Sequence, residues 1–414
     1  MLILRFFFFL FFVLAPCLVE AVDFHLNTTA IGQVRDNEKN QQEAPLNGYL
    51  GLAVAGPASP LSVRTNMRFF HDADRKLDDY DLYQGVVRIH PAEFLRIDAG
   101  RQFVNQGFSV DAIDGMQIGL EPEGHIDGVV YSGIPRSVER GDFSSTIGLL
   151  TGVSIGTKNV KRTNARLHAQ WRKNDIHTQH WKQNDEVFVG ANLSHQFAVT
   201  MTPMVYGLVE YDTFGKVIET GTGGFDLYPT RKVALNLAFT YSDTNRDRDR
   251  KTIQQLFTKG PILSGSLTSR WTLLSHRLDF VETYSLQRIE VQKGNFQLGH
   301  IADTSLPLTL DSIGLYVEPG YSYARSFGGH FHSARLSLHE QLTEAWYVQT
   351  GASFTVYKKV TNDNDNAISS LLWTGYEILK GWTVSGGVEY NKNNEMNRDI
   401  RGSFKVAYSF DHGS

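Results

Sequence analysis

Hydrophobic and polar side chains alternate with a period of two along most of the chain. From Ile400 to Phe410, alternate residues are mainly apolar or glycine, and the residues between them are mainly polar. Successive side chains of a β-strand point to opposite faces, so such a segment forms a strand with one apolar and one polar face. The same alternation occurs at residues 63–69, 165–171, 233–241, 334–338 and 382–390. The pattern therefore predicts an all-β chain.

The predicted strands are unusually long. Ordinary strands run about 5–6 residues, whereas these run about 9–13, which is the length that crosses a bilayer at a tilt. From Trp382 to Tyr390 the chain rises about 26 Å along the strand, or roughly 19 Å vertically at a 45° tilt. Aromatic side chains suit both edges of a membrane, because a mainly apolar ring can carry a polar group that reaches water. The predicted membrane-interface aromatics are Trp382, Tyr390, Tyr408 and Phe410.

The connections between the strands alternate between short and long. The short connections are residues 57–60, 91–93, 121–124, 158–161, 196–198, 228–231, 273–276, 342–345 and 379–381, with 303–311 as a less clear tenth. The long or polar connections are residues 34–47, 72–79, 105–110, 134–144, 174–184, 244–265, 358–366 and 392–399. Outer-membrane barrels show this asymmetry, with tight periplasmic turns and longer extracellular loops.

These observations predict a transmembrane antiparallel up-and-down β-barrel. Counting between the connections gives about 22 strands, within a range of about 18 to 22, in one domain over residues 22–414. The strands extend from near residue 24 to residue 410, and segments 216–230 and 290–302 fit least well. Too few residues precede the first strand for a separate plug domain. A soluble sandwich or propeller is the alternative, but its strands would be shorter.

Composition narrows the function classes. The chain has 414 residues, a mean hydropathy of -0.26 and a formal net charge of -4. Beyond the N-terminus no apolar run reaches about 18 residues, which excludes a polytopic helical membrane protein. Nucleic-acid binding usually needs a concentrated basic face, and nothing here indicates one.

Residues 1–21 have the pattern of a secretory signal peptide. Arg5 supplies a positive charge, residues 6–14 form the apolar run, and Ala21 is a small residue at the cleavage position. An uncleaved anchor is the alternative, which polar and proline interruptions of the run disfavour. Cleavage after Ala21 would remove Cys17, the only cysteine, and leave no disulfide, thiolate ligand or haem-attachment motif.

The charged residues that alternate with the apolar ones are expected to face the lumen. An Arg or Lys at the membrane midplane costs about 2–4 kcal/mol, which disfavours the lipid face. A positively biased wall would select anions, but the sequence favours a mixed wall with ion pairs, because acidic residues offset the bases. The predicted pore-lining residues are Arg64, Arg68, Arg96, Asp98, Arg166, His168, Arg172, Arg335, His339, Glu389 and Lys405, with Arg401 on the same face. Residues 244–265 form either a constriction inside the lumen or a solvated extracellular loop.

Two segments carry a family resemblance. The sequence RGSFKVAYSF (residues 401–410) resembles the closing strand of Gram-negative outer-membrane β-barrels. Residues 81–103, followed by Asp114 and Gly115, resemble the hairpins of porin-like channels, including alginate-export-type barrels. The resemblance of architecture covers nearly the whole mature chain. One departure is that residues 411–414 follow the aromatic at which the family usually ends.

The resemblance implies a porin-like channel for passive diffusion of small hydrophilic solutes or ions across the outer membrane. Outer-membrane lipid and the barrel assembly machinery are the implied partners. A second function stays open, in which the barrel sheaths a periplasmic partner. The porin component of a porin–cytochrome electron conduit resembles that design, with haem carried by the partner. Weak conductance and a co-purifying haem protein would indicate the sheath.

No local pattern marks an enzyme or a metal site. A hydrolase at the membrane edge would need Ser, His and a third polar residue brought together by the fold. His177 and His180 have the HxxH spacing, but two ligands do not make a specific metal site. Residues 362–366 offer oxygen ligands but lack the spaced Gly and terminal Glu of a calcium loop. We therefore predict no enzymatic activity, no metal and no cofactor.

Overall fold

The protein is an antiparallel all-β chain. Its computed structural model describes residues 23–36, 42–55, 60–72, 77–105, 110–122, 124–136, 148–174, 185–199, 201–243, 260–275, 277–292, 294–326, 329–359, 364–394 and 398–412. Within these ranges the chain forms one sheet of 24 strands and a single turn of 3-10 helix, η2 (Asp311–Ile313).

Two of these strands are short, and the others are long enough to cross a bilayer. The strands are β1 (Asp23–Asp36), β2 (Gln42–Glu43), β3 (Pro45–Ala55), β4 (Leu61–Asp72), β5 (Leu77–Ala92), β6 (Leu95–Asn105), β7 (Val110–Leu120), β8 (Ile126–Arg136), β9 (Gly148–Val160), β10 (Thr163–Asn174), β11 (Asp185–Gln196), β12 (Met204–Asp212), β13 (Val217–Thr230), β14 (Val233–Asp243), β15 (Pro261–Leu274), β16 (Leu278–Gln292), β17 (Asn295–Ser305), β18 (Leu308–Leu310), β19 (Leu315–Ser326), β20 (Gly329–Gln341), β21 (Trp346–Lys359), β22 (Asn364–Leu379), β23 (Trp382–Lys392) and β24 (Asp399–His412).

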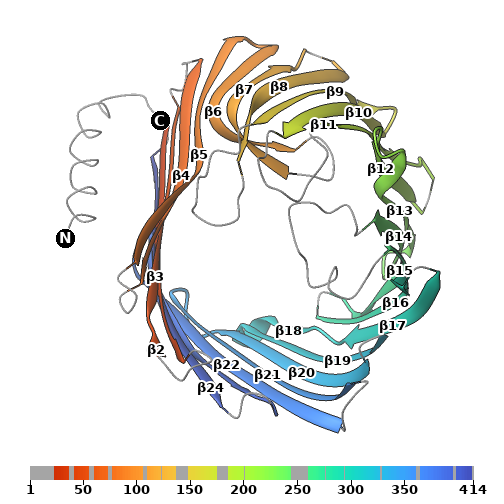
Figure 1. Cartoon of the computed structure of the whole chain (residues 1–414). Helices are drawn as coiled ribbons and strands as arrows, with labels where there is room; N and C mark the ends of the chain where they lie inside the picture. The colour runs from red at the N-terminus through yellow and green to blue at the C-terminus, as the bar shows by residue number, and fades with distance from the viewer. Residues whose placement is uncertain are drawn as a thin grey trace.

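The sheet closes on itself to form a barrel. Each long strand pairs with the long strands before and after it, and β1 pairs with both β3 and β24, so the described ring has 22 members (Figure 1). The short β2 only extends the β1 hairpin, and β18 lies between β16 and β19. Closure leaves no unpaired sheet edge, which suits a hydrocarbon environment that offers no hydrogen bonds. The predicted fold class and strand number are confirmed.

The alternating segments form the strands that the sequence predicts. Segment 382–390 lies within β23, segment 400–410 lies within β24, and the long strands range from 9 to 16 residues. Segment 216–230 is also a strand, β13. Segment 290–302 is not one strand, because β16 ends at Gln292 and β17 begins at Asn295.

The barrel has two distinct ends. Phe24 of β1 pairs with His412 of β24, so the first strand begins where the last one finishes, and we call this the terminal end and the opposite one the loop end. The strand ends that flank the ten predicted short connections all lie at the terminal end. The tenth is built from β18 and η2, followed by Gly314 at a φ of 64°.

Three connections at the loop end are shorter than the predicted alternation requires. Residues 213–216, 293–294 and 327–328 are all that separate the strands there. In the first of these, the Asp212 carboxylate accepts backbone N–H bonds from Phe214 and Gly215 at 3.0 Å each, an interaction that favours a tight turn. The predicted loop 244–265 also ends early, because β15 begins at Pro261; residues 244–259 lie outside the described residues.

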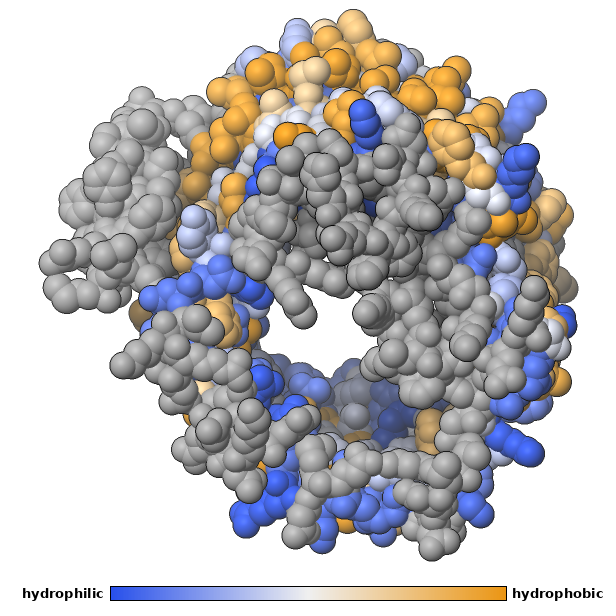
Figure 2. Space-filling model, in the orientation of Figure 1, coloured by the Kyte–Doolittle hydropathy of each residue, from blue (hydrophilic) through white to orange (hydrophobic). Residues whose placement is uncertain are grey.

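The two faces of the wall differ in polarity. In β10, Leu167 is 61% exposed between Arg166 and His168, and cross-strand neighbours continue each face around the ring. The outer surface over β5–β9 is mostly hydrophobic, whereas the wall seen through the central opening is mostly hydrophilic (Figure 2). The face that carries the exposed large apolar side chains is therefore the outward one.

The predicted interface aromatics lie on the outward face. Trp382 and Tyr408 pack together with ring centroids 4.5 Å apart at the terminal end, and Phe410 lies beside Tyr408. Tyr390 lies on the same face near the loop end, opposite Ile400. These positions fit the two edges of an apolar band. Their contact with a membrane stays a prediction.

No helix within the described ranges is both long and apolar enough to cross a membrane. The predicted signal peptide, residues 1–21, lies outside the described residues.

Candidate pore lining

The eleven predicted pore-lining residues all lie on the inward face. Residues that pair directly across strands share a face, and each of the eleven alternates with outward-facing positions of its own strand. Their strands are β4 (Arg64, Arg68), β6 (Arg96, Asp98), β10 (Arg166, His168, Arg172), β20 (Arg335, His339), β23 (Glu389) and β24 (Lys405). Their part in conduction stays a prediction.

Ion pairs cover the inward face of β4, β5 and β6. The Arg68 guanidinium lies 2.5 Å from the Asp81 carboxylate. Arg88 donates two hydrogen bonds to Asp98, at 2.7 and 3.1 Å, and Arg96 approaches the same carboxylate at 3.4 Å. Asp98 is only 3% exposed, so the two guanidiniums compensate a charge that is nearly removed from water.

One ion pair reaches across a whole strand because the middle residue is glycine. Arg166 of β10 and Asp127 of β8 both lie opposite Gly156 of β9, and the two side chains hydrogen-bond over it. A Cβ at Gly156 would meet the Asp127 carboxylate at 2.8 Å. Arg166 also donates to Ser154 at 2.9 Å, and the exposed Lys158 lies 3.8 Å from Asp127. This strand-spanning pair depends on the small middle residue.

A histidine and a glutamate repeat this arrangement on the next strands. His168 of β10 and Glu210 of β12 lie on either side of Gly190 of β11. The His168 Nε2 is 3.0 Å from a Glu210 carboxylate oxygen, and both residues are buried. The His168 ring covers Gly190 so closely that a Cβ there would fall 2.1 Å from it. The pair ties three strands together on the inward face.

Part of the inward face is apolar, contrary to the expectation of a polar wall. The buried cluster on β6–β9 consists of Val104, Ile113, Val129, Tyr131 and Leu150. The Tyr131 hydroxyl donates to Gln170 at 2.8 Å, which joins the cluster to the polar residues of β10. Alternation alone could not predict it, because an apolar residue at an inward position looks like a break in the pattern.

The inward face of β13–β21 carries mainly neutral polar groups. Thr268 and Thr283 hydrogen-bond across β15 and β16 at 3.0 Å. Arg335 is a charged exception, because it donates to both carboxylate oxygens of Asp303, at 2.7 and 2.8 Å. Hydroxyl and amide side chains can exchange hydrogen bonds with a passing hydrated solute without binding it tightly.

His339 and Glu389 take part in local contacts. The His339 ring stacks on Tyr347 of β21 with centroids 5.8 Å apart. Glu389 accepts a hydrogen bond from Asn391 at 2.8 Å and lies opposite Arg401 in the β23–β24 register.

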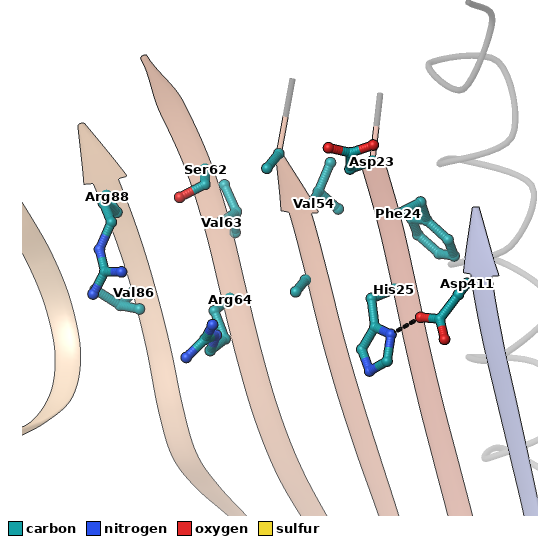
Figure 3. A pocket seen from close by; sticks show the side chains of 12 residues that line it. Asp23, Phe24, His25, Val54, Ser62, Val63, Arg64, Val86, Arg88 and Asp411 are labelled. Atoms are coloured by element: carbon teal, nitrogen blue, oxygen red, sulfur yellow. Dashed lines mark hydrogen bonds and ion pairs between the residues drawn. The ribbon is translucent and has the colours of Figure 1, made fainter. Parts of the chain in front are cut away.

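A small pocket at the terminal end is lined by Arg64, a basic side chain that has no acidic partner among the described residues. The pocket has a volume of about 340 Å³ and lies among β1, β3, β4, β5 and the end of β24. Figure 3 shows Arg64, Arg88 and His25 on three of these strands, with His25 hydrogen-bonded to Asp411. Among the described residues, Arg64 and Lys405 form no ion pair, unlike the other predicted inward-facing arginines.

The structure holds no candidate metal site in its described part. No group of three or more His, Cys, Asp or Glu side chains there could hold a metal ion. His177, His180 and residues 362–363 lie outside the described residues.

Sequence reasoning missed most of the acidic partners. They lie on the inward face as the alternation requires. All except Asp81, whose partner Arg68 lies on the preceding strand, pair with a base on a strand that is not adjacent in sequence; for Asp127 and Arg166 the separation is 39 residues. For these four acids, only the register of several strands brings the two charges together. The missed acids are Asp81, Asp111, Asp127, Glu210 and Asp303.

Comparison with known proteins gives structural neighbours but no sequence relatives. No protein-family model and no curated protein matches the chain. Pseudomonas aeruginosa OpdL is similar at 10% identity and a TM-score of 0.49, over 94% of this chain and 99% of that one. P. aeruginosa OccK5 (OpdH) has 8% identity and a TM-score of 0.49, over 95% and 98%. P. aeruginosa OccK2 (OpdF), solved in complex with glucuronate, has 7% identity and a TM-score of 0.44, over 94% and 98%. The evidence that this chain is a barrel is therefore its own strand pairing, which closes the sheet.

Proposed function

We propose that this protein is an outer-membrane channel for the passive diffusion of small hydrophilic solutes or ions. The observation that carries the proposal is the closed ring of 22 strands with an apolar outward face and a mainly polar inward face. A ring of this size encloses a wide lumen. The described residues all belong to the wall and its turns, so they contribute no plug.

The polarity of the two faces supports an outer-membrane location. A closed barrel satisfies its backbone hydrogen bonds internally, and exposed apolar side chains on its outward face suit lipid. Aromatic residues at both ends of β23 fit the membrane interfaces. Export by a cleaved signal peptide at residues 1–21 is part of the proposal.

The inner wall would act by replacing part of the water around a passing solute. Its arginines are mostly matched by carboxylates at hydrogen-bond distance, so their fields largely cancel a few ångströms from the wall. Arg64 and Lys405 lack such partners among the described residues. The channel is therefore expected to prefer anions only mildly.

The test is single-channel conductance of the refolded protein in a planar lipid bilayer. Large, stable current steps are expected, and a salt gradient should give a reversal potential of the sign that indicates mild anion preference. A folded barrel that conducts no current would contradict the proposal and favour the sheath around a periplasmic partner. No catalytic step is proposed, and a hydrolytic activity that is lost on changing one histidine would contradict that part.

A further inference from the structure

Four basic side chains form a continuous row on the outward face of the barrel. His300 of β17 pairs with Arg325 of β19, Arg325 pairs with His330 of β20, and His330 pairs with Lys358 of β21. Directly paired residues have Cβ atoms about 4.5–5.5 Å apart and share a face. The row therefore places four basic groups side by side across four neighbouring strands.

The row lies where lipid headgroups would meet the barrel. Its face is the outward one, because His300 also pairs with Leu286 of β16, which is exposed among other large apolar side chains. Along β21 the row is twelve residues above the outward-facing Trp346, which is about 28 Å at a 45° tilt. That height is close to the roughly 25 Å of the apolar band of such barrels. The row thus marks the edge of the band at the loop end.

The row lacks acidic counterparts in the described part of the chain. No described carboxylate forms an ion pair with Arg325, His330 or Lys358. Like charges directly opposite each other across strands are destabilising, so the row costs folding free energy when its histidines are protonated beside Arg325 and Lys358, unless an anion neutralises it. Glu290 of the neighbouring strand β16, which also faces outward, instead accepts the backbone N–H of Gly294 at 2.7 Å.

A second outward-facing cluster differs from the row because it contains a carboxylate beside its basic residues. On β6, β7 and β8, the Asp114 carboxylate accepts hydrogen bonds from Arg101 at 2.6 Å and from Arg136 at 2.8 Å. The chain thus supplies a counter-charge for the outward arginines of that wall. It supplies none for the row on β17–β21 among the described residues.

A pocket lies directly below the row. It has a volume of about 670 Å³ and is lined by Tyr321, Tyr323, Arg325, His330 and His332. The Tyr321 hydroxyl is 2.6 Å from the His332 Nδ1, and the Tyr323 and His332 rings lie 4.8 Å apart. Aromatic rings under basic groups match a lipid whose charged headgroup sits above its acyl chains.

We propose that the row His300–Arg325–His330–Lys358, with the pocket beneath it, binds the phosphate-bearing headgroup of an outer-leaflet lipid. Phosphate oxygens would accept hydrogen bonds from the guanidinium and ammonium groups and neutralise the row. Acyl chains would extend along the apolar face toward the terminal end. The proposal rests on the proposed membrane location but not on conduction through the lumen.

Native mass spectrometry of the refolded protein in a neutral detergent tests the proposal. The probe is lipid A that carries two phosphate groups, compared with the same lipid after enzymatic removal of its phosphates. The wild type should bind the phosphorylated lipid, and rising salt should weaken that binding. Equal binding of the two lipids would overturn the proposal.

Substituting Arg325 and Lys358, the two side chains of the row that are charged at neutral pH, tests whether the lipid binds at the row. Arg325→Gln and Lys358→Gln should each weaken lipid binding about 5-fold, and the double variant about 30-fold, since each basic residue near an anionic lipid surface contributes about 1 kcal/mol, which is about 5-fold. Lys173→Gln/Lys392→Gln is the matched control, because both lysines are outward-facing and near the loop end but outside the row. An equal loss in both double variants would overturn the proposal.

Three further measurements distinguish the possible outcomes. Arg325→Lys retains the charge and should bind within about 3-fold of the wild type, which a general folding defect would not allow. Inorganic phosphate at the lipid concentration should not displace the lipid; displacement would mean a free-phosphate site and overturn the lipid assignment. The Arg325→Gln/Lys358→Gln variant should keep its single-channel conductance, so failure of lipid binding and failure of the channel function are separate results.

Discussion

The inner wall of β4–β12 and the outer row of β17–β21 use the same basic residue types in opposite ways. On the inner wall, Arg166 reaches across a strand to a buried carboxylate, and most of the other arginines, such as Arg68 and Arg88, also lie beside a carboxylate. On the outer row, Arg325 lies between two histidines and has no acidic partner among the described residues. A buried charge must carry its counter-ion within the fold, whereas a charge at a membrane edge can take one from the lipid. Replacing a basic residue by a neutral one should therefore lower the free energy of unfolding on the inner wall and raise it on the outer row.

The largest effect is expected from breaking the strand-spanning pair on the inner wall. Arg166→Ala leaves Asp127 buried with only the exposed Lys158 nearby, at 3.8 Å. The free energy of unfolding should fall by about 2–3 kcal/mol, because a buried carboxylate loses its charged hydrogen-bond donor. Urea unfolding of the refolded protein in detergent, followed by tryptophan fluorescence, measures the change.

A double-mutant cycle separates the pair from the loss of packing. Asp127→Ala combined with Arg166→Ala removes both charges, and the double variant should recover about half of the stability lost by Arg166→Ala alone. If the two single losses simply add, the residues do not interact, and the described pair is not a source of stability.

The next effect concerns the glycine beneath the His168–Glu210 pair. Gly190→Ala places a Cβ 2.1 Å from the His168 ring, which must move and lengthen its 3.0 Å contact with Glu210. The free energy of unfolding should fall by about 1–2 kcal/mol, as in other overpacked sites. Gly402→Ala is the control in the same assay, because nothing lies within 4 Å of a Cβ there. Equal stability of the two variants would contradict the crowded geometry.

The sequence predicts the wall better than it predicts the contacts on the wall. Alternation at 382–390 and 400–410 determines which residues share a face, because the side-chain period of a strand is fixed. It cannot predict that Asp127 meets Arg166, or that His300, Arg325, His330 and Lys358 form a row, since both depend on the relative register of several strands. The short connections at 213–216 and 293–294 were missed for a related reason: tight turns occur at either end of a barrel.

A smaller effect of opposite sign is expected on the outer row. In a neutral detergent at a mildly acidic pH, at which histidine side chains carry a positive charge, Arg325→Gln should raise the free energy of unfolding by about 0.2–1 kcal/mol, because it removes a like charge from between two protonated histidines. Lys392→Gln, outward-facing but opposite the apolar Ile368, should leave the stability unchanged in the same urea titration. A loss of stability with Arg325→Gln would show that the row is held by interactions within the protein.

The smallest effect separates unpaired from paired charges inside the lumen. Arg64→Gln should lower the ratio of anion to cation permeability about twofold. A unit charge about 8 Å away in water shifts the free energies of an anion and a cation by about 0.5 kcal/mol each in opposite directions, and salt screening over about one Debye length reduces that difference about threefold. Arg166→Gln combined with Asp127→Asn also removes an inward-facing arginine, but it removes the matching carboxylate too, so the permeability ratio should not change. Reversal potentials in a salt gradient measure both. If the paired substitution shifted the reversal potential as much as Arg64→Gln, ion selectivity would depend on the number of lumenal arginines and not on whether each has a carboxylate beside it.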